Sequence, residues 1–480
     1  MKNKILHISK IIVAVLLLTF QSCSEDVLET APSDQVDLEL AVSSVANAEA
    51  TLLGAYSRFR SGLYYTGTLT ALGDIMTGNA SITAINNGQY AFMYRYDFNS
   101  ATQVVDDIWN RAYSIIGNVN PIIVAMPAYN NINDPNIDRK DQITGEAHAL
   151  RALAYFDLLR VYGSRMNNPT SEFGVPIPTA QIVPSTDPQP RSSVQEVLDL
   201  IINDLNTALG LLDGDESDVT RVNRNMVYAL LSRVYLYTEN YTEAINAANN
   251  VAGVSLINNQ GTFNNFWTNS AGSELIWKIA VTPVDGANQF SWTYLFPVNT
   301  VRQDYIVTQG LLDSYEPTDF RRNVYYSQIQ SSSDNQVRNT ITKFRDNPAI
   351  NQSGVVEIMP FRYAEVLLNR MEAHFESGNE GSALSDLNSL RVARGLGSVT
   401  LSGNTLRQAI RDERRKELAF EGHYWHDLKR WNLDMVRVQE ENCTSCTFTV
   451  PSSSNFWLLP VPVGETDVNP NITQAPGYSN

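Results

Sequence analysis

The sequence has few of the residues that support metal, redox or nucleic-acid chemistry. It contains only 3 Cys and 5 His among 480 residues, and 35 Lys and Arg against 51 Asp and Glu, so the formal net charge is −16. A structural zinc site needs four clustered ligands, and binding to phosphate backbones needs concentrated basic side chains. The composition therefore argues against a metal centre and against nucleic acid as a partner.

Long hydrophobic runs are also missing, except at the start of the chain. Residues 11–20 form a mostly apolar run that follows three lysines. A helix that spans a bilayer needs about 20 apolar residues, so this run is too short and has instead the pattern of a secretory signal. Ser22 then precedes Cys23, which resembles the cleavage and acylation site of bacterial lipoproteins. We expect residues 1–22 to be a signal peptide and Cys23 to be lipidated.

Lipidation at Cys23 would explain how an acidic chain stays at a membrane. Removal of residues 1–22 takes away three Lys and no acidic residue, so the net charge moves from −16 to −19. Such a chain has no electrostatic attraction to anionic lipid, and covalent acyl chains would have to hold it there. An ordinary signal peptide with an incidental Cys is the alternative.

Cys443 and Cys446 are the two remaining cysteines. In an oxidising compartment they could close a small local disulfide. Their surroundings read as loop, whereas a redox motif would lie between a strand and a helix. We expect either a loop staple or two free thiols.

Helical periodicity accounts for much of the chain. Residues 145–163 give the clearest helix, because this stretch is rich in Ala and Leu and ends in a glycine. Ser192 or Ser193, with Gln195 or Glu196 placed behind it, predicts a capping box at the start of another helix.

Four pairs of predicted helices are joined by turns or longer links. The pairs are 40–60 with 105–125, 146–162 with 194–212, 225–238 with 241–251, and 362–377 with 381–394. Small residues at the crossings permit close approach, as in a tetratricopeptide hairpin. The loops between pairs are too long for a plain solenoid. We therefore predict a mostly α fold, in which tetratricopeptide-like hairpins form a scaffold and long irregular loops with short β segments carry the ligand site.

The same patterns predict one mature domain, residues 23–480. Within it we expect the helical scaffold over roughly 38–60, 104–252 and 361–437, and loop-rich regions over roughly 61–100, 253–350 and 438–480.

Five stretches carry a resemblance to a known family. They are 145–163 with 175–176, 190–194 with 204–205, 361–366 with 372–373, 414–422 with 425–431, and 459–462 with 469–478. In this order, behind a lipoprotein signal, they resemble the SusD/RagB family, the surface lipoproteins that Bacteroidetes use for nutrient capture. Ala475 departs from the family, whose members commonly carry Asn there.

The resemblance implies a location, a partner and a ligand class. Members of the family pair with a SusC-like TonB-dependent barrel transporter and act as a lid over it, presenting an oligosaccharide or, in the RagB branch, a peptide. The acidic residues after Cys23 also resemble the surface-export tag of Bacteroidetes lipoproteins. We accordingly expect an outer-membrane, lipid-anchored protein that faces the cell exterior.

Aromatic residues among Asn, Gln and Asp mark two loop regions as candidate ligand sites. Sugar rings stack on aromatic faces, while their hydroxyls bind amides and carboxylates. The predicted contacts are Asp74, Asn79, Tyr90, Tyr94, Tyr96, Trp267, Trp292 and Tyr294. Trp292 and Tyr294 rank first, because strand-like alternation would put both on one side. The opposing interpretation is that each aromatic packs a loop onto the scaffold. We assign Trp109 to the core, because it lies on the apolar stripe of its helix.

An enzyme is the least favoured interpretation. The charged cluster at 414–427 could pass for an active site, yet buried carboxylates facing guanidinium groups more often fix a helix crossing. His423 and His426 have no further metal ligand placed by the sequence. No nucleophile elbow, Walker loop or dinucleotide fingerprint appears, so we expect no catalytic residue and no cofactor. A glycoside hydrolase would need two facing carboxylates, and a helical-repeat protein–protein scaffold is the rival of another class.

Overall fold

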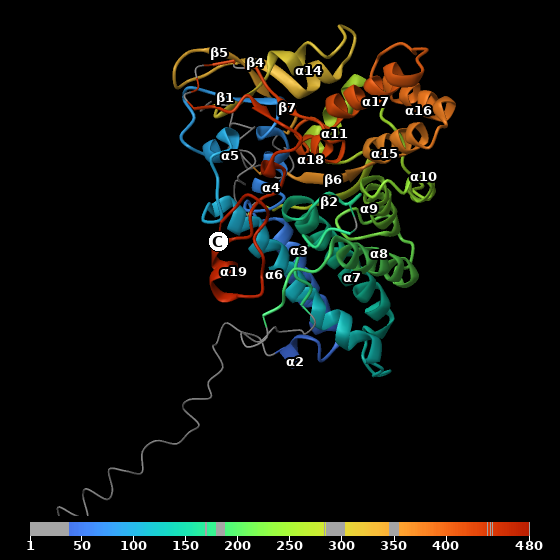
Figure 1. The fold of residues 1–480 in the computed structure, drawn as a ribbon. Helices are drawn as coiled ribbons and strands as arrows, with labels where there is room; N and C mark the ends of the chain where they lie inside the picture. Colours follow the sequence, from blue (N-terminus) through green and yellow to red (C-terminus); the bar gives the residue numbers. More distant parts are fainter. Residues whose placement is uncertain are drawn as a thin grey trace, which may run out of the picture.

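The fold is a column of helices with most of its short strands and irregular segments on one flank (Figure 1). The computed structural model describes residues 38–168, 170–178, 188–282, 284, 303–344, 355–438, 440–441, 443 and 445–479. Helices dominate these residues, and the strands are two to five residues long. The predicted mostly α fold is confirmed.

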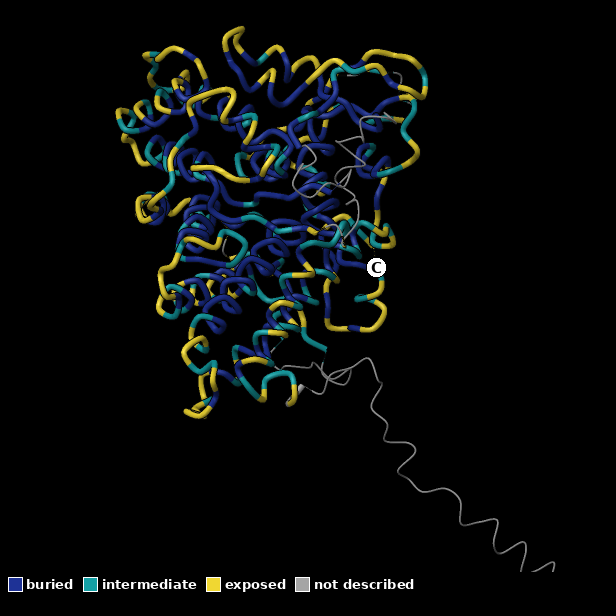
Figure 2. Tube along the Cα trace, turned by 180° about the vertical axis from the view of Figure 1, so that it is seen from behind, coloured by how far each residue is buried: buried dark blue, intermediate teal, exposed yellow. Residues whose placement is uncertain are grey.

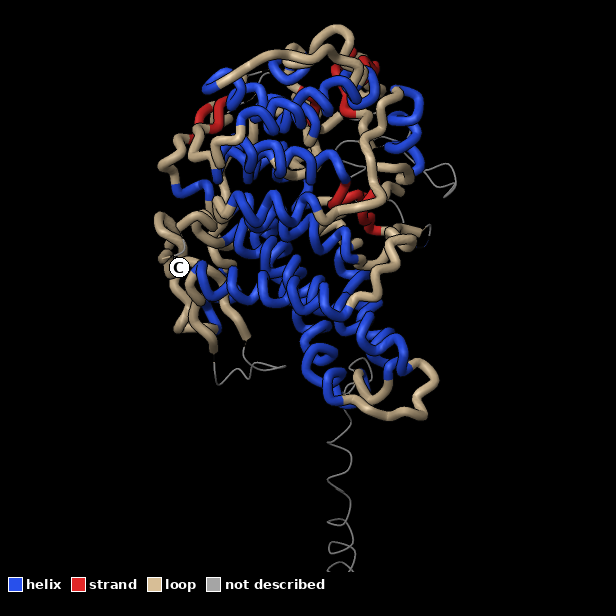
Figure 3. Tube along the Cα trace, turned by 90° about the vertical axis from the view of Figure 1, so that its right-hand side faces the viewer, coloured by secondary structure: helices blue, strands red, loops and turns tan. Residues whose placement is uncertain are grey.

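Four pairs of packed helices coincide with the predicted hairpins. They are α3 (Val45–Phe59) with α6 (Gln103–Ala125), α7 (Lys140–Tyr162) with α8 (Val194–Leu211), α9 (Arg224–Tyr237) with α10 (Tyr241–Asn249), and α15 (Tyr363–Glu376) with α16 (Glu380–Ala393). The pairs also contact one another, because α6 packs on α7, α8 on α9 and α10 on α15. Figure 3 shows the resulting stack, which α17 (Gly403–Glu417) extends.

Local sequence explains where individual helices begin and how they pack. The side chain of Ser193 accepts a hydrogen bond from the Glu196 main-chain N–H, and the Glu196 carboxylate accepts one from the Ser193 N–H. This is the predicted capping box. Helix α7 begins at Lys140, earlier than predicted, and almost every side chain from Ile143 onward is buried. This burial on all sides places α7 at the centre of the column. A helix that is covered all round has no separate apolar stripe in its sequence.

Short antiparallel strand pairs connect segments that are distant in the sequence. Within the described residues these pairs are β1 (Ala80–Ile82) with β3 (Tyr305–Val307), β2 (Leu275–Ile279) with β6 (Ile358–Arg362), β4 (Tyr326–Gln330) with β5 (Val337–Ile341), and β7 (Met435–Val436) with β8 (Thr449–Val450). Strand β2 is one of the short β segments expected within the loop-rich region 253–350. In the first pair, Ala80 faces Val307 and Ile82 faces Tyr305.

The regions predicted as loop-rich also contain short helices. These are α4 (Thr68–Ile75), α5 (Ala91–Arg95), α11 (Gln260–Asn269), α13 (Gln309–Leu312), α14 (Arg321–Tyr325) and α19 (Val463–Val468); α2 (Leu38–Ala41) begins the described chain and α18 (Tyr424–Arg430) follows α17. Every residue of α4 is buried, so its sequence has no amphipathic period to detect. Within the described ranges, no helix combines the length and apolarity that a bilayer crossing requires.

Two hydrophobic clusters form most of the interior. The larger lies among α3, α6, α7, α8 and α9 and includes Trp109, as expected. The second lies under α5, α11 and α14 and is rich in aromatic rings, among them Tyr94 and Trp267. Seen from behind, buried segments run through the whole body and exposed ones lie on its rim (Figure 2).

A buried ion network joins the irregular flank to the column. Glu417 Oε1 accepts from Arg362 Nη1 at 2.6 Å and Arg394 Nη2 at 2.7 Å, and its Oε2 accepts from Arg321 Nη1 at 2.8 Å. All four side chains are buried. Burial by itself would raise the pKa of Glu417, but the charges of Arg394, Arg362 and Arg321 hold it well below its usual value. The geometry therefore supports a structural role for this part of the 414–427 cluster.

Gly73 in α4 provides a test of how tightly the flank is packed. A Cβ at this position would lie 2.3 Å from the Gly422 carbonyl carbon and 2.4 Å from its Cα, so backbone would have to move. We expect Gly73→Ala to lower the free energy of unfolding by about 2–3 kcal/mol, as overpacking does, measured by urea denaturation. Gly117→Ala in α6 is the control, since a Cβ there meets nothing within 4 Å and alanine favours helix. Equal stabilities of the two variants would contradict the close approach.

Candidate functional site

Asp74 and Asn79, two of the predicted ligand contacts, bind each other inside the protein. Asn79 Nδ2 donates to Asp74 Oδ1 at 2.7 Å, and the Gly422 N–H donates to Asp74 Oδ2 at 3.2 Å. Arg415 Nε donates to Asn79 Oδ1 at 2.7 Å. Burial raises the pKa of Asp74 to about 6. Both side chains are fully buried, so they hold α4 against the segment after α17 and present no group at the surface.

The predicted aromatic contacts within the described residues are buried as well. Tyr90, Tyr94, Tyr96 and Trp267 each expose no more than 7% of their surface. The ammonium of Lys343 lies 4.4 Å from the Trp267 ring centroid, which leaves that ring face covered. A ring without an open face cannot stack on a sugar. The structure thus gives these four residues the packing role of the opposing interpretation, and direct contact with a ligand is not supported.

Three predicted residues lie outside the described part of the chain. They are Trp292 and Tyr294, our first choices for ligand stacking, and Cys23, the lipidation residue. Their roles stay predictions.

Helix α5 presents a different aromatic residue to solvent. Its flanking residues Tyr90 and Tyr96 have φ values of 53° and 58°, a left-handed conformation that costs free energy for any residue except glycine and often marks functional sites. Between them, Phe92 and Arg95 are three residues apart and so share a face. Phe92 is 58% exposed. Among the described residues, every other Phe, Tyr and Trp is buried or half-buried.

A hollow of about 300 Å³ lies against this face of α5. Its walls come from the end of β1, the turn that follows, α5 and the disulfide loop: Ile82, Thr83, Ala84, Asn86, Gly88, Ala91, Phe92, Arg95 and Cys443. An open ring, an amide and a guanidinium therefore meet at one concave surface. That combination suits a ligand with an apolar face and polar substituents. We call the hollow and the exposed face of Phe92 the α5 site.

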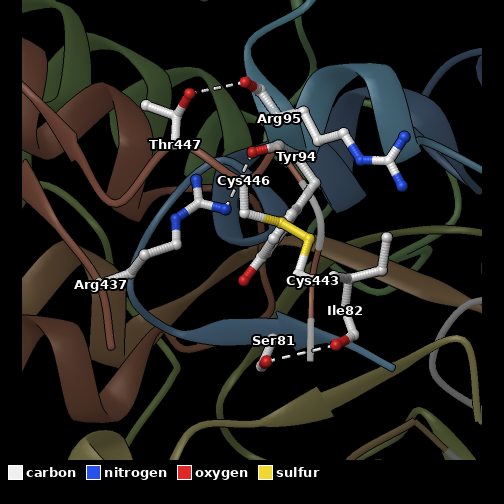
Figure 4. The surroundings of a disulfide bond; sticks show 8 residues. All are labelled: Ser81, Ile82, Tyr94, Arg95, Arg437, Cys443, Cys446 and Thr447. Atoms are coloured by element: carbon white, nitrogen blue, oxygen red, sulfur yellow. Dashed lines mark hydrogen bonds between the residues drawn. A yellow bond between two sulfur atoms is a disulfide. The ribbon is translucent and has the colours of Figure 1, made fainter. Parts of the chain in front are cut away.

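The disulfide loop holds the main chain of α5 in place (Figure 4). Cys443 and Cys446 are bonded, so the loop staple is the correct one of our two alternatives. Thr447 Oγ1 donates to the Arg95 carbonyl at 2.7 Å, and Arg437 Nη1 donates to the Tyr94 carbonyl at 2.9 Å. These two hydrogen bonds attach the C-terminal segment to α5.

A larger hollow of about 600 Å³ lies between α9 and the loops around it, and two of its asparagines already bind the main chain. Asn225 exchanges two hydrogen bonds with the Ala252 main chain, at 2.8 and 2.9 Å. Asn223 caps α9 and donates to the Ile276 carbonyl. Because no exposed aromatic ring lines that hollow, we place the candidate site at α5, where Phe92 is 58% exposed.

Nothing in the described residues assembles a metal site. No group of three or more His, Cys, Asp or Glu there could hold an ion. His423 and His426 are both buried, and burial together with nearby arginines keeps their pKa values well below the usual range. They are neutral residues of the interior.

Phe92, Arg95 and Asn86 were not predicted from the sequence. A five-residue helix is too short to show a clear helical period, and the three neighbouring tyrosines are the more numerous aromatics. The sequence feature that could have identified the site is the spacing of three between Phe92 and Arg95, a few residues after the Asn86-Asn87-Gly88 turn.

Comparisons with known proteins match nearly the whole chain. A family model described as "SusD family" matches residues 287–478, and one described as "Starch-binding associating with outer membrane" matches residues 28–236. Two SusD-like proteins of Formosa agariphila are 28% and 26% identical, over 88% and 98% of this chain and 90% and 99% of their own. The crystal structure of a SusD superfamily protein from Bacteroides vulgatus is 25% identical, covers 91% of this chain and 100% of its own, and gives a TM-score of 0.81.

Proposed function

Because the chain belongs to the SusD/RagB family, we propose that it is a cell-surface lipoprotein that captures a glycan at the α5 site. Capture would deliver the glycan to a TonB-dependent outer-membrane transporter of the SusC type. The description of the family that matches residues 28–236, starch-binding and associating with the outer membrane, supports both the carbohydrate ligand and the location. The signal-like residues 1–22 and Cys23 support a lipid anchor on a mature domain of residues 23–480.

The observation that carries the proposal is the open ring of Phe92 beside a polar hollow. A pyranose has a face of C–H bonds that stacks on an aromatic ring, and hydroxyls that need amide and charged partners around it. Phe92 offers the ring and Arg95 offers a charged partner within one concave surface, and the Asn86 amide beside them also binds the main chain of Gly88, Gln89 and Asp304. The alternative from the RagB branch is a peptide ligand at the same surface.

Phe92→Ala tests the assignment directly. On an array of glycans and peptides, residues 24–480 should bind a glycan, and the substitution should weaken that binding by about 2 kcal/mol, close to thirtyfold, as expected for a central aromatic contact. The melting temperature should stay unchanged, because the ring is exposed. Leu53→Ala on α3, where the side chain is 49% exposed, is the control and should keep full affinity.

Four outcomes would count against the proposal. Undiminished affinity of Phe92→Ala would remove the α5 site, and binding to peptides alone would favour the RagB-like alternative. A protein that ignores every ligand yet co-purifies with a barrel would favour the protein–protein scaffold. Release of products from a polysaccharide by the purified protein would establish the hydrolase that we consider least favoured.

A further inference from the structure

Arg95 carries a positive charge that nothing in the described part of the chain neutralises. Its Nε is buried and has no hydrogen-bond partner. It is also the one charged residue in the lining of the α5 site. Arg338 on the same flank, by contrast, forms ion pairs with Asp334 and Glu441. Glu441 is not part of the lining, and its two oxygens are bound by Arg338 and by the N–H of Ala84, a lining residue, at 3.0 Å.

Arg437 adds a second positive charge under α5. It is buried, and its Nε and Nη2 have no hydrogen-bond partner in the described residues. Its guanidinium lies 4.0 Å from the Tyr94 ring centroid, an attraction that offsets part of the cost of burial. Figure 4 shows Arg437 and Arg95 extending to opposite sides of the Cys443–Cys446 disulfide. The one charge that lines the hollow, that of Arg95, is therefore positive, on a chain whose net charge is −16.

Building on the proposed glycan capture, we propose that the ligand of the α5 site is an anionic glycan, whose carboxylate or sulfate group binds Arg95. Residues three apart on a helix have Cβ atoms about 5–6 Å apart, so a sugar ring over Phe92 brings its charged substituent to Arg95. An incoming anion displaces no internal carboxylate there, and it supplies the counter-charge that a partly buried guanidinium lacks. Acidic surface elsewhere repels the same glycan, which directs it to this face.

The experiment compares neutral, uronate-containing and sulfated polysaccharides on residues 24–480 at low salt. We expect the tightest ligand to be charged, and its affinity to fall when salt is raised, because screening weakens exposed charge pairs. Methyl-esterification of a bound polyuronate, or desulfation of a bound sulfated glycan, should each weaken binding about tenfold, and the pair of treatments distinguishes carboxylate from sulfate.

Arg95→Gln should weaken binding of the charged glycan about tenfold and remove its salt dependence, while Arg95→Lys should keep most of both. Arg58→Gln, an exposed arginine on α3, is the matched control and should behave as the parent. Tight binding of neutral glycans only, or an Arg95→Gln protein with unchanged affinity, overturns the anionic ligand and leaves glycan capture standing. Binding of acidic peptides only, or of no glycan at all, overturns both.

Discussion

Replacing Glu417 with glutamine is expected to lower the free energy of unfolding by about 3–5 kcal/mol. The carboxylate accepts hydrogen bonds from Arg321, Arg362 and Arg394, and all of these groups are buried. An amide has one acceptor oxygen and no charge, so the substitution leaves three guanidinium groups insufficiently compensated in the interior. Chemical denaturation at neutral pH measures the loss.

Asp412→Asn is the matched control, because Asp412 lies on the same helix but is exposed. Exposed substitutions of this kind change stability by about 0.5 kcal/mol or less. If the two variants were equally stable, the ion network would contribute nothing beyond surface charge.

The lowered pKa of Glu417 also determines how its contribution to the free energy of unfolding depends on pH. The pKa of Glu417 in the folded protein lies well below its usual value of 4.5, because the arginines outweigh the effect of burial. Its contribution is therefore complete above pH 4.5 and is lost as the pH falls through the folded pKa. We expect the stability difference between the parent and Glu417→Gln to shrink steadily below pH 4.5, as measured by denaturation at several pH values. A difference that stayed constant across this range would contradict the lowered pKa.

Replacing Cys23 with alanine is expected to abolish uptake of the cognate glycan without changing affinity for it. Acyl chains on this residue would keep the binder beside its transporter, and such a tether acts by raising local concentration. Uptake of labelled glycan by cells, and binding by the purified variant, measure the two effects separately. Ser22→Ala keeps a small residue before the cysteine and should preserve uptake. Cells carrying Cys23→Ala that still took up the glycan would refute the anchor.

Local signals made the helical column predictable, whereas the site depended on distant contacts. The Ser193–Glu196 capping box needs only residues three apart, and it is present in the structure. The aromatic residues were harder, because the same tyrosine can line a surface or fill a core. Tyr94 and Trp267 belong to the second hydrophobic cluster, and only the tertiary packing of α5, α11 and α14 decides that.

The partners of the α5 site explain why its residues were missed. Phe92 lies exposed on a five-residue helix whose flanking residues, Tyr90 and Tyr96, take left-handed conformations. Thr447 and Arg437 secure that helix from the other end of the chain. No spacing rule connects positions so far apart in sequence, so a sequence pattern cannot place them together.

The strand pair β1–β3 has a consequence for how relatives of this chain can diverge. Helix α3 packs on α6, and α10 packs on α15, so the residues between the members of each pair are excursions that leave the column and return to it. Such excursions tolerate changes in length and sequence better than the packed helices do. Yet Ala80–Ile82 of one excursion pairs with Tyr305–Val307 of the other, which ties the two together. New specificities would then arise by joint evolution of both excursions on an inherited column.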